Sequence, residues 1–203
     1  MPLPPNPDVR GFLPDDEGQF LHELALEAAA LGPVLEIGSY CGRSTIWLAE
    51  AARQLDSVVL ALDHHRGSEE HQPGEMFHDS ALLDEAGQID TLREFRRNIA
   101  TAGLEDHVIA LVANSRAAAH WWQGEFGMVF IDGGHSLDSA LADWRLFGTR
   151  VSPGGILAIH DVFEDAEAGG QAPFTIWRLA VASGLYQECG RCGSLRALAR
   201  LGG

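Results

Sequence analysis

Five short apolar runs alternate with segments of helical periodicity, and this alternation limits the possible fold more than any other feature of the sequence. Each run has the length of a buried strand and is too short to be a buried helix. Strands that alternate with helices form a mainly parallel sheet with helices on both faces. We therefore predict a Rossmann-like α/β fold with a seven-stranded, mainly parallel sheet and a C-terminal antiparallel hairpin. The strands are expected at 34–37, 58–62, 108–112, 128–131, 156–159, about 185–189 and about 194–199, and the helices at 14–31, 44–53, 91–102, 116–122, 137–147 and about 173–183.

The length and composition fit one domain, 1–203, because 203 residues with 46% hydrophobic content can build a sizeable core. Residues 1–32 are expected to form an N-terminal helical extension. Residues 64–90 lack periodicity, and a loop of this length inside a compact domain is usually functional or mobile. Since the loop follows Asp63 directly, we expect it to be a lid that closes over the active site and excludes water. Its predicted acceptor contacts are Glu69, Glu70 and His71.

The formal net charge of −15 argues against a nucleic acid or an anionic membrane as a partner. All fourteen basic side chains are arginine, which we attribute to a high-GC genome such as that of an actinobacterium. The lack of lysine also excludes Schiff-base chemistry on a lysine side chain. Three cysteines are too few for a disulfide framework, and no segment resembles a signal peptide or a membrane helix. We therefore expect a cytoplasmic protein.

Polar residues stand at the carboxyl ends of the predicted strands, where ligands bind in open α/β sheets. After the first strand, Gly38 and Gly42 allow the backbone to approach a ligand closely, since neither carries a Cβ. The turn differs from the G-x-G-x-x-G that binds a pyrophosphate, and Glu36 just before it favours a cationic ligand. Asp63, at the end of the second strand, is placed to accept hydrogen bonds from both hydroxyls of a ribose. The alternative is that the two glycines only make a turn.

The segment 36–42 (EIGSYCG), Asp63 and the segment 131–135 (IDGGH) resemble the class I S-adenosylmethionine-dependent methyltransferases, over roughly residues 30–165. The resemblance implies S-adenosylmethionine as the cofactor, with the first turn at its amino-acid end, Asp63 at its ribose and residues 114–115 at its adenine. One departure is Tyr40, where many relatives have glycine, and it leaves the fine geometry of the turn open. The cofactor-binding residues implied in this way are Glu36, Gly38, Ser39, Gly42, Ser44, Asp63, His64, Asn114, Ser115 and Asp132.

Asp132, His160 and Asp161 follow two strands that we expect to be neighbours, so the three side chains are predicted to meet around one cation. Two carboxylates and an imidazole suit a divalent ion such as Mg²⁺, with Mn²⁺ as the alternative. Such an ion would bind the acceptor hydroxyl and lower its pKa, which is the obstacle to O-methylation. His135 and Asp132 are the predicted catalytic residues, with His135 taking the proton. Simpler interpretations stay open: Asp132 caps the next helix or contacts the cofactor, and His160 and Asp161 bond each other and the backbone.

The same residues are similar to a branch of small bacterial enzymes that contains cephalosporin-hydroxylase-like proteins and sugar O-methyltransferases of macrolides and aminocoumarins. In that branch, an aspartate after the fourth strand and two adjacent acidic residues after the fifth hold magnesium. Asp132 and Asp161 match this pattern, whereas His160 stands where an acidic residue is usual. The resemblance implies an O-methyltransferase for a small hydroxylated acceptor, and a homodimer by family habit. A saccharide is the predicted acceptor, because the loop 64–90 offers carboxylates and imidazoles but no obvious aromatic cradle.

The lysine-free composition and the segment 63–74 also resemble the mycobacterial sugar methyltransferases of methylmannose polysaccharide biosynthesis. That resemblance implies transfer to the 1-hydroxyl of a 3-O-methylated mannoside. Two other function classes stay open: a nucleotide-cofactor oxidoreductase or epimerase on the same fold, and a non-catalytic ligand-binding protein. The lack of G-x-G-x-x-G and Tyr-x-x-x-Lys motifs counts against the first of these.

Two further sets of residues are interpreted as structural. Cys189 and Cys192 have the spacing of a redox motif, but they lie in the predicted hairpin, away from a helix N-terminus that would lower a thiol pKa. We predict a turn that contains both cysteines. Trp121, Trp122 and Trp144 are predicted to lie in the core.

Overall fold

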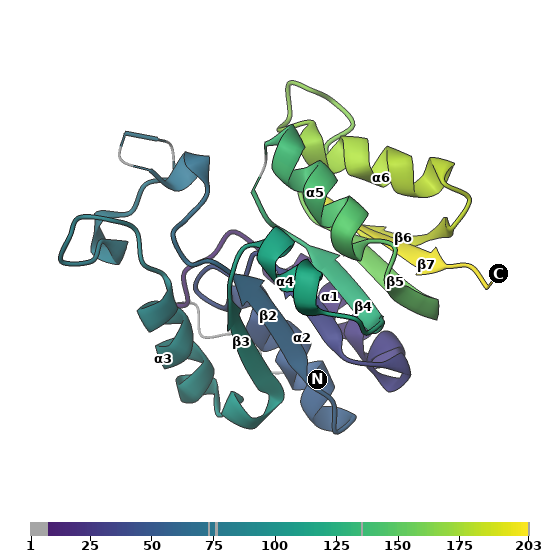
Figure 1. Cartoon of the computed structure of the whole chain (residues 1–203), viewed down its shortest axis with the longest axis horizontal. Coiled ribbons are helices and arrows are strands. Elements are labelled where there is room, and N and C mark those ends of the chain that lie inside the picture. The colour runs from purple at the N-terminus through teal and green to yellow at the C-terminus, as the bar shows by residue number, and fades with distance from the viewer. Residues whose placement is uncertain (1–7, 73, 76, 135, 203) are drawn as a thin grey trace.

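One sheet of seven strands runs through the part of the chain that the structure describes, which is residues 8–72, 74–75, 77–134 and 136–202 of a computed structural model. Its strands are β1 (Val34–Ile37), β2 (Val59–Asp63), β3 (Val108–Val112), β4 (Phe126–Ile131), β5 (Val151–Ile159), β6 (Tyr186–Cys192) and β7 (Leu195–Arg200). They lie in the order β3-β2-β1-β4-β5-β7-β6 (Figure 1). The first five strands are parallel, and β7 lies antiparallel between β5 and β6. The predicted Rossmann-like fold with a C-terminal hairpin is confirmed.

Helices cover both faces of this sheet (Figure 1). The helices α1 (Asp15–Ala28), α2 (Arg43–Gln54) and α3 (Leu92–Ala102) pack on one face, and α4 (Ser115–Trp121), α5 (Leu137–Phe147) and α6 (Ala172–Ala182) pack on the other. Successive strand residues point to opposite faces, so Val34 belongs to the first core and Leu35 to the second. Among the described residues, we find no helix whose length and apolar character would let it cross a membrane.

The three tryptophans that were predicted to lie in the core occupy different environments. Trp144 is buried, as predicted, and Trp122 is half-buried and stacks on Phe126 with 5.4 Å between ring centroids. The prediction is wrong for Trp121, whose side chain is 82% exposed. The short helix α4 buries Ala119, and a residue two positions later lies roughly 200° further around the helix. Trp121 therefore points away from the sheet.

Strand β5 begins earlier than predicted. The segment 153–155 (Pro-Gly-Gly) was expected to be a turn, but it lies inside the strand. Phe126 pairs with Val151 and Met128 with Ile156, so the register shifts and the intervening residues of β5 bulge. The segment that signals a turn in the sequence is therefore a bulge in an irregular strand.

The predicted turn that contains two cysteines is also wrong. Cys189 and Cys192 lie in β6, and the hairpin turn consists of Gly193 and Ser194. Gly193 has a φ of +49°, a left-handed conformation that glycine adopts at little cost. Both thiols are free, and burial raises the pKa of Cys189. The two cysteines are therefore ordinary strand residues.

The segment 64–90 has little regular structure in its described residues. It contains two short 3₁₀ turns, Glu69–His71 and Ser80–Leu82. Arg66 lies 2.8 Å from a carboxylate oxygen of Asp84 and donates to the carbonyl of Ile89 at 3.2 Å. These contacts hold the two ends of the loop together.

Candidate active site

A cavity of about 740 Å³ opens at the carboxyl ends of β1, β2, β4 and β5, which is the size of a small-molecule site. His135, the predicted base, lies outside the described residues. Glu36 and Gly42 are not among the residues that line the cavity. The other residues predicted to bind the cofactor, the metal or the acceptor all line it: Gly38, Ser39, Ser44, Asp63, His64, Glu69, Glu70, His71, Asn114, Ser115, Asp132, His160 and Asp161.

The turn after β1 is held against β4 and β2. Gly38 has a φ of +89°, and a Cβ at this position would collide with the backbone carbonyl of Asp132, so the close approach requires glycine. The carboxylate of Asp63 accepts hydrogen bonds from the backbone N–H groups of Ser39 at 3.0 Å and Tyr40 at 2.8 Å. Its other oxygen accepts the N–H of His65 at 2.7 Å. Asp63 therefore fixes the turn, and its predicted contact with a ribose stays a prediction.

The carboxylate of Glu36 is fully buried beneath this turn. It accepts hydrogen bonds from the hydroxyls of Ser44 at 2.6 Å and Thr45 at 2.5 Å. Burial raises the pKa of Glu36 to about 8, against the opposing effect of the two hydroxyls. Glu36 thus ties β1 to the start of α2 and positions Ser44, which lines the cavity, rather than lining the cavity itself. Gly42, with a φ of +92°, precedes α2 and packs towards Phe95.

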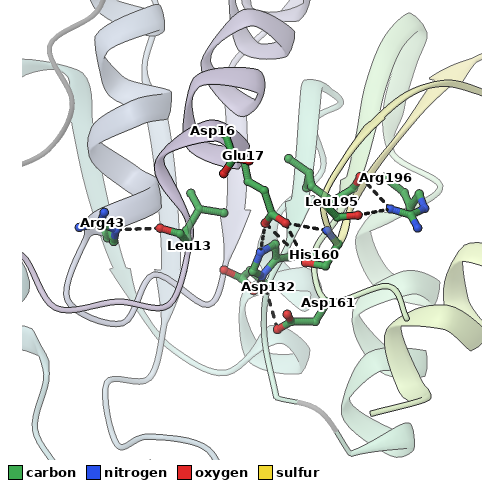
Figure 2. A network of polar contacts seen from close by, with 11 residues as sticks. Leu13, Asp16, Glu17, Arg43, Asp132, His160, Asp161, Leu195 and Arg196 are labelled. Carbon is green, nitrogen blue, oxygen red and sulfur yellow. Dashed lines mark hydrogen bonds and ion pairs between the residues drawn. The ribbon is translucent and has the colours of Figure 1, made fainter. Parts of the chain in front are cut away.

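Three polar side chains meet where β4 and β5 end (Figure 2). Potential ligand atoms of Asp132, His160 and Asp161 lie within 4.8 Å of one another, as the sequence predicted. His160 Nδ1 lies 3.0 Å from Asp132 Oδ1 and 3.4 Å from Asp161 Oδ2. On the other side of the ring, His160 Nε2 lies 2.5 Å from Oε2 of Glu17, which comes from the first turn of α1.

The carboxylates around His160 keep its ring protonated. Burial alone would lower the pKa of His160, but Asp132, Asp161 and Glu17 outweigh it and raise the pKa to about 12. Burial likewise acts to raise the pKa of Glu17, but hydrogen bonds from His160 and Ser194 lower it overall. A doubly protonated imidazole has no lone pair for a metal ion, so a cation would have to replace one ring proton. The metal role of His160 stays a prediction, since its potential ligand atom lies within 4.8 Å of those of Asp132 and Asp161.

Comparison with known proteins identifies the family. The model of a family described as methyltransferase domain matches residues 35–162, which is more than half of the chain. The chain belongs to this family. The match begins in β1 and ends just after Asp161, so it covers the glycine turn and the cluster at the ends of β4 and β5. It confirms the predicted methyltransferase class and overturns the alternative of an oxidoreductase or epimerase.

Solved structures of other methyltransferases share the fold. The O-methyltransferase NovP superposes with a TM-score of 0.69 at 15% identity, over 92% of this chain and 80% of that chain. TomG of Streptomyces achromogenes, which is involved in tomaymycin synthesis, gives 0.60 at 18% identity, over 97% and 83%. An O-methyltransferase of Bacillus cereus gives 0.60 at 19%, over 93% and 84%. At these identities the likeness establishes the fold alone.

Two residues of this candidate site were not predicted from the sequence. Glu17 accepts the backbone N–H of Ser194 at 2.6 Å in addition to its bond with His160, but an acidic residue in the first turn of a helix is unremarkable in sequence. Asp143 lines the cavity, is 5% exposed and is hydrogen-bonded to Ser115, and burial raises its pKa to about 6. An aspartate on the buried face of helix 137–147 was a signal that could have revealed it.

Proposed function

We propose that this methyltransferase transfers the methyl group of S-adenosylmethionine to a hydroxyl of a small acceptor. One observation carries the proposal: the glycine turn after β1 and the carboxylates of Asp132 and Asp161 face the same cavity. A methyl donor bound at the turn would therefore share one space with groups that can activate a hydroxyl. The names of NovP and TomG as O-methyltransferases support oxygen as the atom that is methylated.

The charges around the cavity favour a cationic cofactor. Its described lining contains seven carboxylates, from Asp63, Glu69, Glu70, Asp132, Asp138, Asp143 and Asp161, against three arginines, Arg10, Arg43 and Arg116. Negative potential favours the sulfonium and ammonium groups of S-adenosylmethionine and disfavours a pyrophosphate. In this proposal the turn at 38–39 and Ser44 hold the amino-acid end, and Asp63 and His64 hold the ribose. Asn114, Ser115 and Asp143 border the adenine.

The proposed divalent cation, Mg²⁺ or Mn²⁺, would be held by Asp132 and Asp161, with His160 as the third proposed ligand. Both carboxylates are partly exposed to the cavity, with 20% and 27% of their side-chain surface accessible, and carboxylates are the ligands that such ions prefer. When bound, the ion would lower the pKa of the acceptor hydroxyl. His160 also holds Asp132 in place. His135 remains the proposed base that takes the hydroxyl proton.

The proposed acceptor is a saccharide, and the 1-hydroxyl of a 3-O-methylated mannoside in polysaccharide biosynthesis is the narrowest candidate. Glu69, Glu70 and His71 line the cavity, and carboxylate oxygens accept hydrogen bonds from sugar hydroxyls. The segment 64–90 supplies these side chains, so its role as a lid is part of the same proposal. We also propose that the protein is cytoplasmic and that its one-domain subunits form a homodimer. Light scattering of the purified protein would test the homodimer.

The test is release of S-adenosylhomocysteine with a panel of methylated and unmethylated glycosides, in Mg²⁺ and again in EDTA. Turnover that EDTA abolishes, and that Asp161→Asn reduces at least tenfold, supports both O-methyl transfer and the metal. Asp106→Asn is the matched control, since Asp106 is an exposed carboxylate that does not line the cavity. Turnover that survives chelation would contradict the metal. No turnover on any glycoside would contradict the saccharide and favour another class of acceptor or a non-catalytic protein.

A further inference from the structure

Four aromatic rings gather on one side of the cavity. Phe12 precedes α1, Tyr40 belongs to the turn after β1, and His71 and Phe77 belong to the segment 64–90. The ring centroids lie 4.9 Å apart for Phe12 and Phe77, 5.9 Å for Phe12 and Tyr40, and 5.0 Å for Tyr40 and His71. All four residues line the cavity. We call these four side chains the aromatic platform.

The platform leaves apolar surface open. Phe12 is 59% exposed and Phe77 is 37% exposed, although large apolar rings are usually buried when no ligand covers them. Both rings lie beside the half-buried Tyr40 and His71 and face a cavity that already has polar walls. Apolar walls with a few convergent polar groups are typical of small-molecule sites. The exposed rings therefore indicate a ligand with an apolar face.

Ion pairs and hydrogen bonds hold the segments that carry Phe12 and Phe77. Arg43 of α2 donates to the backbone carbonyls of Leu13 at 2.8 Å and Val9 at 3.3 Å, so it holds the segment that carries Phe12. Arg10 of the same segment lies 2.9 Å from a carboxylate oxygen of Asp79, two residues after Phe77. The platform is therefore preorganised, which lowers the entropic cost of binding.

The platform lies next to the proposed site of chemistry. A Cβ at Gly134, two residues after Asp132, would lie 3.8 Å from Cβ of Ser68, and the hydroxyl of Ser68 lies 2.8 Å from Nδ1 of His71. The segment after β4 therefore lies close to Ser68, and Ser68 is hydrogen-bonded to His71 of the platform. A ring that lies on the platform can keep one hydroxyl within the part of the cavity that contains Asp132.

We propose that the aromatic platform is the acceptor subsite and that it binds a neutral pyranoside through the C–H face of the sugar ring. This inference rests on the proposed function and names its acceptor chemistry. The apolar face contacts Phe12 and Phe77, while the carboxylates of Glu69 and Glu70 border the same cavity and accept hydroxyl protons. The excess of carboxylates in the lining disfavours sugar phosphates and nucleotide sugars. The expectation that the loop 64–90 offers no aromatic cradle was wrong, because its His71 and Phe77 combine with Phe12 and Tyr40 in the cavity wall.

The experiment measures binding of 3-O-methyl-mannopyranose, whose 1-hydroxyl is free, to the protein loaded with S-adenosylhomocysteine, by calorimetry and by saturation-transfer NMR with irradiation of aromatic protons. We expect saturation to reach the protons on one face of the sugar ring. Phe12→Ala and Phe77→Ala should each weaken acceptor binding about tenfold and leave the affinity for S-adenosylhomocysteine within twofold. Phe12→Tyr keeps the ring and should bind normally. Trp121→Ala is the matched control, because Trp121 is an exposed aromatic residue on α4.

The outcomes separate this inference from the proposed function. Pyranoside binding that depends on Phe12 and Phe77 but yields no methylated product supports the platform and contradicts sugar methylation. Turnover of pyranosides with unchanged acceptor affinity in both variants overturns the platform alone. Weaker binding of S-adenosylhomocysteine to the same extent also overturns it, as does selective binding of a phenol or of mannose 1-phosphate. If Phe12→Ala does not fold, Phe12→Leu removes the ring while keeping apolar bulk.

Discussion

Glu17 connects the N-terminal helix to the end of β5 through one buried carboxylate. It bonds His160 and the backbone of Ser194, and its side chain is 4% exposed. Removing the charge of Glu17 weakens the charged hydrogen bond at Nε2 of His160, while Asp132 and Asp161 still face Nδ1. Glu17→Gln is therefore expected to lower the free energy of unfolding by about 2 kcal/mol, measured by urea denaturation at pH 7. Asp16→Asn, at the exposed neighbouring position, should change it by less than about 0.5 kcal/mol, and equal effects would contradict the role of Glu17.

Glu36 is expected to make stability depend on pH. Its pKa is raised from 4.5 to about 8, so between these values the folded state holds a proton that the unfolded state has released. Raising the pH therefore destabilises the fold, by up to about 1.4 kcal/mol per pH unit from this group. Glu36→Gln cannot ionise, so its stability relative to the wild type should rise from pH 5 to pH 8, measured by urea denaturation at each pH. Parallel curves for the two proteins would exclude a raised pKa, and Glu23→Gln, at an exposed position, is the control.

Helices and strands were predicted well from the sequence, because their apolar periodicity survives in the structure. β1, β3 and α5 begin and end where their patterns do. β5 was predicted too short because a bulge uses the same proline and glycine residues as a turn. The pattern of neighbouring residues in the sequence also cannot show contacts between residues that are far apart in the chain. Glu17 and His160 are 143 positions apart, and the rings of the platform come from three segments.

The segment 64–90 is the element whose removal should separate acceptor binding from cofactor binding. Replacing residues 66–75 by a short Gly-Ser linker removes His71 and two carboxylates from the cavity and leaves β1 and β2 intact. We expect the acceptor KM to rise at least tenfold, while the affinity for S-adenosylhomocysteine in calorimetry stays within about threefold. Shortening the exposed segment 165–168 after β5 is the control. An equal loss of acceptor and cofactor binding would show that the segment supports the whole site instead.

The cavity draws its walls from residues 10 to 161, so a ligand bound there stabilises the whole molecule rather than one element. A ligand that binds only the folded state at a hundred times its Kd adds about 2.7 kcal/mol, which for a chain of this length raises Tm by roughly 5–10 °C. We expect S-adenosylhomocysteine to produce this shift in a thermal unfolding experiment. NAD⁺ at the same concentration should produce none, since its pyrophosphate would meet the excess of carboxylates that lines the cavity. A shift with NAD⁺ equal to that with S-adenosylhomocysteine would mean that the acidic lining does not select the cofactor. Asp63→Asn should weaken the shift, because Asp63 fixes the turn that the cofactor would contact.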